Sequence, residues 1–353
     1  MGPVLGLETS CDDTAVAVLA EDGRILAQTR SSQDDEHAPF GGIVPEIAAR
    51  AHALRLDRLI ARAMAEAGLH FRDLGAIAVT AGPGLIGGLA VGVVTAAAIG
   101  SVHRLPVVPI NHLEGHALTA RLTDGAAFPY LLLLLSGGHS QLIAVEGVGR
   151  YRRLGTTLDD ALGEAFDKVA KLSGLGFPGG PAVERTATGG DPSRYALPRP
   201  MVGQPGCHFS FSGLKTAVRQ VLPTLPEGPE RAAALADLCA SFQQAAFDAV
   251  ADRTAKAVRR FRERWPDGRE LVVAGGVAAN RALRRRLDDL AARQRLCLKV
   301  PPPELCTDNG VMIAWAGIER LRAGLESEHP LQARARWPLD PEAEPAPGAG
   351  VKA

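Results

Sequence analysis

One order of strands and helices is written twice in this chain, and this repeat limits the possible folds more than any other feature. In the first half, short apolar runs between turn residues predict strands at Val4–Glu8, Thr14–Leu19 and Arg24–Gln28. In the second half, the same pattern predicts strands at Tyr130–Leu135, Ser140–Val145 and Arg150–Leu154. A repeat of this kind indicates two structural units built on one plan.

Each triplet of strands is followed by the same further elements. Apolar residues at helical spacing predict an amphipathic helix within Val44–Ala67 and another at Asp160–Leu172. An apolar strand with a glycine-rich end, a helix and a last strand follow, with the strands at Ala76–Gly84 and Val107–Ile110, then at Leu271–Gly276 and Leu296–Val300. This order predicts an α/β protein with the duplicated fold of actin, sugar kinases and the seventy-kilodalton heat-shock ATPases, in which two similar lobes enclose a nucleotide cleft. The fold does not fix the chemistry.

The length of 353 residues also favours two lobes over one compact core. We expect an N-terminal lobe of residues 1–110 plus 307–335 and a C-terminal lobe of residues 111–306. Asp308–Arg322 is predicted to be the final helix. Residues 338–353 contain mostly Pro, Ala, Gly and Glu, with little apolar content, and are expected to form a disordered tail.

Composition narrows the function classes. Lys+Arg and Asp+Glu each number 39, so the net charge is zero, and contact with nucleic acid would need a local basic patch or a partner. Five cysteines without a CxxC pair favour a reducing compartment, and Glu8 interrupts the apolar start, which argues against a signal peptide. Residues 74–102 are uncharged, but Gly82-Pro83-Gly84 breaks the run, so we expect a buried strand, a loop and a helix from about Ile86 rather than a membrane span.

Two histidines directly follow the predicted strand at Val107–Ile110. His112 and His116 are four residues apart, so on a helix both imidazoles lie on one face and can reach one metal ion. With nine histidines in the chain, such a pair arises by chance in roughly one chain of this kind in five. The plainer alternative is one capping and one core histidine. Glu114 is predicted to point away from that face, unlike the glutamate of a metallopeptidase HExxH motif.

A third ligand must come from elsewhere in the chain. Asp308 opens the predicted last helix, where it could also be the helix N-cap, a role that Thr307 could equally fill. Two histidines with one carboxylate suit Fe(II) or Zn(II), and this set with open positions is often seen for Fe(II).

Several other segments could carry chemistry. Ser136-Gly137-Gly138-His139 links two apolar strands, and its glycines would let the backbone approach an anion. Gly275–Asn280 follows a strand and opens a helix, so Asn280 is either a cap or a nucleotide ligand. Asp167 lies off the apolar face of its helix and can point at a ligand, whereas Glu164 and Lys168 form an ordinary helical ion pair. Asp12, at a hairpin tip, could act as a base, although turn acids are often only solvated.

Eight segments together resemble one protein family. They are LETSCDDTAVAVL, FGGIVPEIAARAH, INHLEGHALTARL, LLLLLSGGHSQL, LDDALGEAFDKVAKLSGLGFPGGP, FSFSGLKTAV, VVAGGVAANRALR and PPPELCTDNGVMIAWAG. In this order and spacing, from about Val4 to Leu321, the chain resembles the bacterial branch of the tRNA threonylcarbamoyladenosine transferases, formerly described as O-sialoglycoprotein endopeptidases. Phe40, where many members have Tyr, and the Pro/Ala-rich tail depart from the pattern, and neither touches a proposed site residue.

The resemblance implies a reaction and its components. Members transfer a threonylcarbamoyl group from threonylcarbamoyl-adenylate to the N6 amine of adenosine 37 in tRNAs that read codons beginning with A. The implied metal ligands are His112, His116 and Asp308, with Fe(II) favoured over Zn(II), and Asp12 matches an acidic residue with a suspected catalytic role. The implied adenylate-binding residues are Leu135, Ser136, Gly137, Gly138, His139, Asp167, Gly180, Glu184 and Asn280. The implied partners are tRNA, a metal-free paralogue and a small ATPase, in the cytoplasm and without a membrane.

Two other function classes are compatible with parts of the pattern. A metallopeptidase is favoured only by the histidine pair and disfavoured by the predicted direction of Glu114. An ATP-dependent kinase or chaperone-like module of the same fold has no need for the histidine pair.

Overall fold

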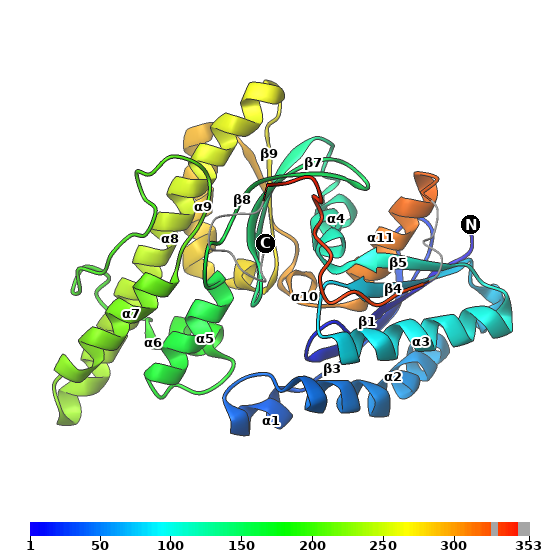
Figure 1. Cartoon of the computed structure of the whole chain (residues 1–353), viewed down its shortest axis with the longest axis horizontal. Coiled ribbons are helices and arrows are strands. Elements are labelled where there is room, and N and C mark those ends of the chain that lie inside the picture. Colours follow the sequence, from blue (N-terminus) through cyan, green and yellow to red (C-terminus); the bar gives the residue numbers. More distant parts are fainter. Residues whose placement is uncertain (326–330, 345–353) are drawn as a thin grey trace. The chain divides into compact units, whose positions relative to one another are not determined.

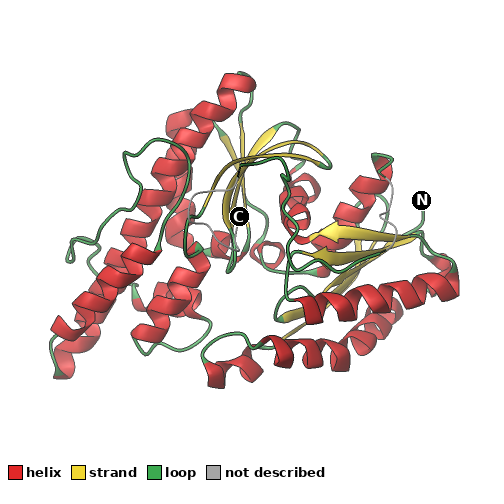
Figure 2. Cartoon of the chain, viewed as in Figure 1, coloured by secondary structure: helices red, strands yellow, loops and turns green. Residues whose placement is uncertain are grey.

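The first half of the chain forms a five-stranded mixed sheet. The computed structural model describes residues 1–325 and 331–344 (Figures 1 and 2). The strands are β1 (Val4–Glu8), β2 (Asp13–Leu19), β3 (Ile25–Ser32), β4 (Ala76–Gly82) and β5 (Val107–Asn111), in the order β3-β2-β1-β4-β5. β1 is antiparallel to β2 and parallel to β4, and β5 is parallel to β4.

The second sheet repeats this plan. Its strands are β6 (Tyr130–Leu135), β7 (Ser140–Gly147), β8 (Arg150–Thr156), β9 (Glu270–Ala274) and β10 (Cys297–Lys299), in the order β10-β9-β6-β7-β8. β6 is antiparallel to β7 and parallel to β9, as β1 is to β2 and β4. The repeat predicted from the sequence is therefore confirmed, with each strand in the equivalent position of its own sheet.

The chain divides into two compact units. Among the described residues, unit 1 comprises Met1–Ala126, Gly147–Tyr151 and those within Pro301–Pro341, and unit 2 comprises Ala127–Glu146, Arg152–Val300 and residues 342–344. Helix α4 (His112–Asp124) belongs to unit 1, whereas the expected lobe boundary fell before it, at residue 110. The difference arises because α4 packs on α11 (Gly310–Arg322) and on β5 of the first sheet.

Side chains along β1 alternate between the two faces of the first sheet. Leu5 and Leu7 lie in the apolar core between the first sheet and helices α2 (Pro45–Ala67) and α3 (Ile86–His103). Gly6 and Glu8 alternate with them and point to the opposite face of the sheet, against which α11 packs. The absence of a side chain at Gly6 lets α11 approach β1, because a Cβ there would lie 2.8 Å from the Cβ of Ala314.

Helix α3 is apolar on both its buried and its exposed sides. By length and composition it could cross a membrane, but one such helix is weak evidence, because buried helices of globular proteins pass the same test. Here α3 packs on α2 and β4 through small residues such as Gly88 and Gly92, while Val94 and Val102 are exposed. The predicted strand, loop and helix of this region are confirmed as β4, residues 83–85 and α3.

Unit 2 carries helices that the repeat did not predict. After β8 come α5 (Leu162–Leu172), α6 (Gly179–Thr186), α7 (Ser212–Val221) and the long α8 (Arg231–Arg264), and α9 (Arg281–Gln294) lies between β9 and β10. The short helices α1 (Asp34–His37) and α10 (Pro303–Cys306) belong to unit 1. Of the unit 2 helices, the repeat predicted α5, which follows its triplet of strands, and α9, which lies between the last two strands, but not α6, α7 or α8.

The chain after α11 returns to the first sheet. Arg334 N donates to the carbonyl of Ala81 at the end of β4, and the Asn111 side chain donates to the carbonyl of Trp337. Of the predicted tail, residues 338–344 contain no helix or strand, and residues 345–353 lie outside the described residues.

Candidate metal centre and substrate loops

A side-chain cap fixes the start of helix α4, which carries the two histidines. The Asn111 side chain at the end of β5 caps the helix by accepting a hydrogen bond from Leu113 N at 2.9 Å. His112 is the first helical residue, and His116 follows one turn later. Both are buried, and their rings meet edge to face with centroids 4.9 Å apart. The alternative in which one histidine caps the helix is wrong, since Asn111 does so.

Asp308 lies just before α11 and is not the cap of that helix. The cap is Asn309, whose side chain accepts a hydrogen bond from Met312 N at 2.8 Å. Neither capping candidate named from the sequence, Asp308 or Thr307, fills this role. The Asp308 carboxylate is thereby left to point toward the histidines, with 22% of its side chain exposed.

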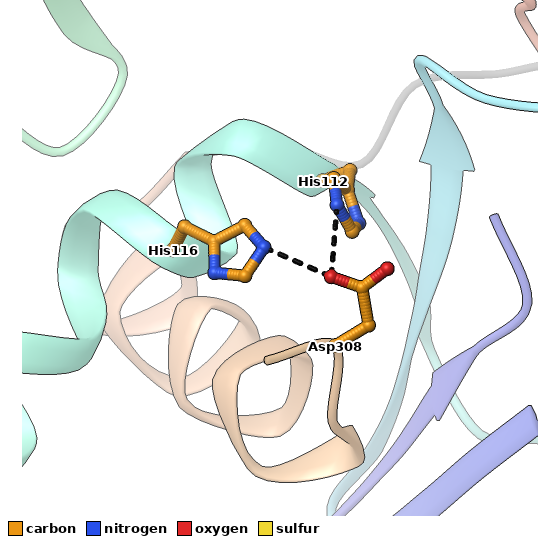
Figure 3. A group of neighbouring side chains, drawn as sticks. All are labelled: His112, His116 and Asp308. Carbon is orange, nitrogen blue, oxygen red and sulfur yellow. Dashed lines mark hydrogen bonds and ion pairs between the residues drawn. The ribbon is translucent and has the colours of Figure 1, made fainter. Parts of the chain in front are cut away.

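Three ligand atoms converge within unit 1, as Figure 3 shows. Asp308 Oδ1 lies 3.1 Å from His116 Nε2 and 3.5 Å from His112 Nε2. Ligands about 2.0–2.2 Å from a tetrahedral metal ion lie roughly 3.3 Å from one another. These two separations, the mutual distances of at most 4.8 Å among the three ligand atoms, and the donor set of two imidazoles and one carboxylate fit a divalent metal ion.

Three further polar residues form a hydrogen-bonded group with His112. Glu8, fully buried at the end of β1, places Oε2 3.0 Å from His112 Nδ1. Thr80 Oγ1 donates to the same carboxylate oxygen at 2.5 Å, and Ser10 N donates to Oε1 at 2.6 Å. Ser10 Oγ also lies 3.1 Å from His112 Nδ1. This group was not predicted from the sequence, although a glutamate that ends an otherwise apolar strand was a visible signal.

Opposite charges stabilise each other in this group without metal. Burial lowers the pKa of His112, but the carboxylates of Asp308 and Glu8 outweigh burial and raise that pKa to about 9. Burial raises the pKa of Asp308, but the two histidines outweigh it and hold the pKa well below its usual value. The pKa of Glu8 is also lowered by His112 in spite of burial. In metal-free protein at neutral pH, both ring nitrogens of His112 are therefore protonated and the imidazole carries a positive charge.

The second ring proton of His112 makes metal uptake depend on pH. A metal ion needs the neutral imidazole, so below a pKa of about 9 binding must displace the His112 proton. We expect the apparent affinity for Zn(II) to rise about tenfold per pH unit from pH 6.5 to 8.5, with release of about one proton per ion. Calorimetry in buffers of different ionisation enthalpy measures both quantities. An affinity that does not change with pH would contradict the assignment of the proton to His112.

Glu114 is engaged away from the metal ligands. Its Oε1 accepts hydrogen bonds from Tyr151 Oη at 2.8 Å and from Gly149 N at 3.2 Å, and its Oε2 pairs with Arg320 at 3.0 Å. The predicted direction of Glu114 is therefore confirmed. A carboxylate held in this way cannot activate a metal-bound water as in the HExxH peptidases.

Asp12 lies half-buried in the turn between β1 and β2. Burial raises its pKa, and the nearby charge of Asp308 raises it further. The carboxyl group can therefore take up a proton nearer neutral pH than an exposed aspartate can.

The substrate residues predicted from the family resemblance lie on elements of unit 2 that contact one another in a ring. The Gly275 backbone packs so closely on Leu135 that a Cβ there would meet the Leu135 carbonyl. Arg281 N, next to Asn280, donates to Glu184 Oε1 at 2.8 Å, which joins α9 to α6. Gly179 N donates to Asp167 Oδ1 at 2.9 Å, which joins α6 to α5. Gly163 N at the start of α5 donates to the Ser136 carbonyl at 3.3 Å and closes the ring.

Individual side chains of this ring have structural partners. Asn280 caps α9 by accepting from Ala282 N and Leu283 N, and it also donates to Gln243. The cap named as one alternative for Asn280 is therefore present. In the Ser136–His139 turn, His139 N donates to Ser136 Oγ at 3.1 Å. The predicted Glu164–Lys168 pair is also present, at 2.9 Å.

Three glycines in this group are not explained by packing. A Cβ at Gly137, Gly138 or Gly180 would meet no described atom within 4 Å, and none of the three has a positive φ. Gly163 contrasts with them, because its Cβ would lie 2.7 Å from the Ser136 carbonyl oxygen. Because no described atom packs where a side chain would lie, a ligand can approach the backbone at these three glycines.

A family model and the proteins of similar sequence that we compared carry the same enzyme name. A family model described as TsaD, tRNA N6-adenosine threonylcarbamoyltransferase, matches residues 24–315. A protein of Rhodospirillum rubrum with that enzyme name is 59% identical over 99% of this chain and 98% of its own length. One of Paramagnetospirillum magneticum with the same name is 60% identical over 96% of this chain and 98% of its own length.

Solved structures agree with the chain in fold. The HypF protein of T. kodakarensis has a TM-score of 0.61 at 14% identity, covering 91% of this chain and 48% of that protein. Component A of the (R)-2-hydroxyglutaryl-CoA dehydratase of Acidaminococcus fermentans has a TM-score of 0.51 at 13% identity, covering 92% and 100%. At such identities the likeness concerns the fold alone, and it confirms the duplicated α/β fold of the actin-like ATPases.

Proposed function

The chain belongs to the tRNA N6-adenosine threonylcarbamoyltransferase family and is therefore an acyltransferase acting on an adenosine of tRNA; on this premise we propose that His112, His116 and Asp308 hold the metal ion of its active site. The observation that carries the proposal is the convergence of three ligand atoms from α4 and from the loop before α11. Two histidines and one carboxylate favour Fe(II) over Zn(II), although both accept this donor set.

The donor in our proposal is threonylcarbamoyl-adenylate, and the acceptor is the N6 amine of adenosine 37. The N6 lone pair attacks the carbamoyl carbon, the bond from that carbon to the phosphate oxygen breaks, and AMP leaves. A bound metal ion would supply Lewis acidity to a carbamoyl or carboxylate oxygen of the donor. Asp12 is proposed to accept the proton that N6 loses, and its raised pKa suits this role.

Unit 2 is proposed to bind the adenylate. The residues are Leu135, Ser136, Gly137, Gly138, His139, Asp167, Gly180, Glu184 and Asn280. Two observations support the assignment: their elements are joined in one ring, and three of the glycines leave open backbone. Backbone N–H groups in glycine turns suit a phosphate.

Partners and location complete the proposal. The chain has zero net charge, so we propose that tRNA is recruited with the help of a metal-free paralogue and a small ATPase. We further propose a cytoplasmic location, which agrees with five cysteines that form no disulfide. The metallopeptidase alternative is disfavoured by the hydrogen bonds that hold Glu114 away from the metal ligands.

Reconstitution tests the proposed function. Purified chain is stripped with a chelator and then reloaded with Fe(II) or Zn(II) or left empty. Each sample is combined with threonine, bicarbonate, ATP, the adenylate-forming enzyme, the partner proteins and tRNA. We expect mass spectrometry of the tRNA nucleosides to find threonylcarbamoyladenosine only with reloaded protein. Equal product from stripped protein would overturn the metal role, and no product from any sample would overturn the proposed reaction.

A further inference from the structure

Glu8 is a fully buried acid that the proposed reaction does not use. Strand alternation turns its side chain away from the apolar core and toward the face on which α11 packs. Burying an ionised carboxylate is costly unless hydrogen bonds and opposite charge surround it. An apolar residue at this strand end would be cheaper, so the contacts of Glu8 have to account for its presence.

Two donors fix the Glu8 carboxylate in place. Because β1 pairs in parallel with β4, Thr80 lies beside Glu8, and its hydroxyl donates to Oε2 at 2.5 Å. The backbone N–H of Ser10 donates to Oε1 at 2.6 Å, in the turn that follows the strand. Each oxygen is therefore held by a group of the first sheet or its turn, and the orientation of the carboxylate is set before any ligand binds.

The third contact of Glu8 is to a proposed metal ligand. An ionised carboxylate only accepts hydrogen bonds, so His112 Nδ1, 3.0 Å from Oε2, must be the donor. With the proton on Nδ1, the lone pair of the neutral ring lies on Nε2, the atom nearer to Asp308. His116 differs: its Nδ1 is buried and has no hydrogen-bond partner among the described residues.

We propose that Glu8 is a positioning residue of the metal centre, which fixes the ring orientation and tautomer of His112 so that Nε2 faces the ion. The inference rests on the proposed metal site and adds a residue to it. A carboxylate bonded to the far nitrogen of a histidine ligand also makes that ligand more basic and strengthens metal binding. Glu8 further adds a negative charge, so that a divalent ion with Asp308 and Glu8 gives a buried group of no net charge.

The test compares Glu8→Gln with the unaltered protein, using Zn(II) as probe. Glutamine has the same shape but lacks the charge, so we expect Zn(II) affinity in chelator competition to fall about 10–100-fold with the fold retained. In Zn(II)-loaded protein with 15N-labelled histidine, the hydrogen-bonded Nδ1 proton of His112 should move upfield. The Nδ1 signal of His116 serves as an internal reference and should not move.

A matched control separates positioning from general stability. Thr14→Val removes a hydrogen bond to another buried histidine of unit 1, His52, whose Nδ1 lies 2.8 Å from Thr14 Oγ1. This variant should keep the Zn(II) affinity of the unaltered protein, even if it unfolds at lower temperature. Should Glu8→Gln fail to fold, Thr80→Val loosens the carboxylate by one hydrogen bond and should lower the affinity about three- to tenfold.

Each result has one meaning. Affinity unchanged in Glu8→Gln, or in Thr80→Val where the first variant does not fold, overturns the positioning role. The same loss in Thr14→Val also overturns it, because the effect would then be a general one. If the unaltered protein binds no Zn(II) through His112, the proposed metal site itself fails, which is a separate outcome.

Discussion

Replacing His112 and His116 together with alanine is expected to abolish metal binding and threonylcarbamoyl transfer while leaving the fold in place. The double variant keeps one of three ligands, and a lone carboxylate does not retain the ion. Helix α4 stays helical because Asn111 still caps it and because Leu113 and Leu118 remain buried. Metal content by mass spectrometry should fall from about one ion per chain to almost none, with an unchanged far-ultraviolet circular dichroism spectrum.

The control for this prediction is another buried histidine of unit 1. His37 is fully buried, lies 3.2 Å from the Gln33 side chain and accepts a hydrogen bond from Val44 N, neither of which is a proposed ligand. His37→Ala should keep full metal content and transfer activity. Full metal content in the double variant would show that the ion binds elsewhere, and loss of metal in His37→Ala would show that the effect is not specific.

Replacing Gly310 with alanine is expected to destabilise unit 1 and to weaken metal binding through displacement of Asp308. A Cβ at Gly310 would lie 2.5 Å from Ala17 N and from the carbonyl carbon of Val16, so the start of α11 must move off β2. Alanine favours a helix by about 1 kcal/mol over glycine, but overpacking against backbone costs about 1–3 kcal/mol or more. We expect a net loss of stability in chemical denaturation and at least about tenfold weaker Zn(II) binding, because Asp308 is two residues away.

Gly42→Ala is the matched control. A Cβ at Gly42 would meet no described atom within 4 Å, so its stability should change by less than about 0.5 kcal/mol. Zn(II) affinity should stay the same. A Gly310→Ala variant as stable as Gly42→Ala would contradict the close packing of α11 on β2. A destabilised Gly310→Ala variant with undiminished Zn(II) affinity would contradict the coupling of that packing to Asp308.

Periodic features of the fold could be predicted from the sequence. Apolar strands and turn residues gave both triplets of strands, and β1 and β6 match their predicted bounds. Helices α6, α7 and α8 were not predicted, because they interrupt the repeat between β8 and β9. Helix α4 was predicted in the C-terminal lobe but belongs to unit 1. Its place is determined by its packing against α11, some two hundred residues later in the chain.

The site shows the same limit at the level of single residues. Helical spacing identified His112 and His116 as a pair, and the family resemblance added Asp308. The reason that Asp308 is available, namely that Asn309 caps α11, depends on a helix start that sequence places only to within a residue or two. In the sequence, Glu8 was interpreted only as a charged residue that interrupts the apolar start of the chain and so argues against a signal peptide. Its contact with His112 requires the pairing of β1 with β4 and the direction of α4, which are long-range features.

The most direct test of the metal centre is anomalous diffraction from crystals of metal-loaded protein, recorded on both sides of the metal absorption edge. We predict one strong anomalous peak per chain, about 2.0–2.2 Å from His112 Nε2, His116 Nε2 and an Asp308 carboxylate oxygen. A peak at another group of residues, or no ordered metal in crystals of protein that is loaded in solution, would contradict the account.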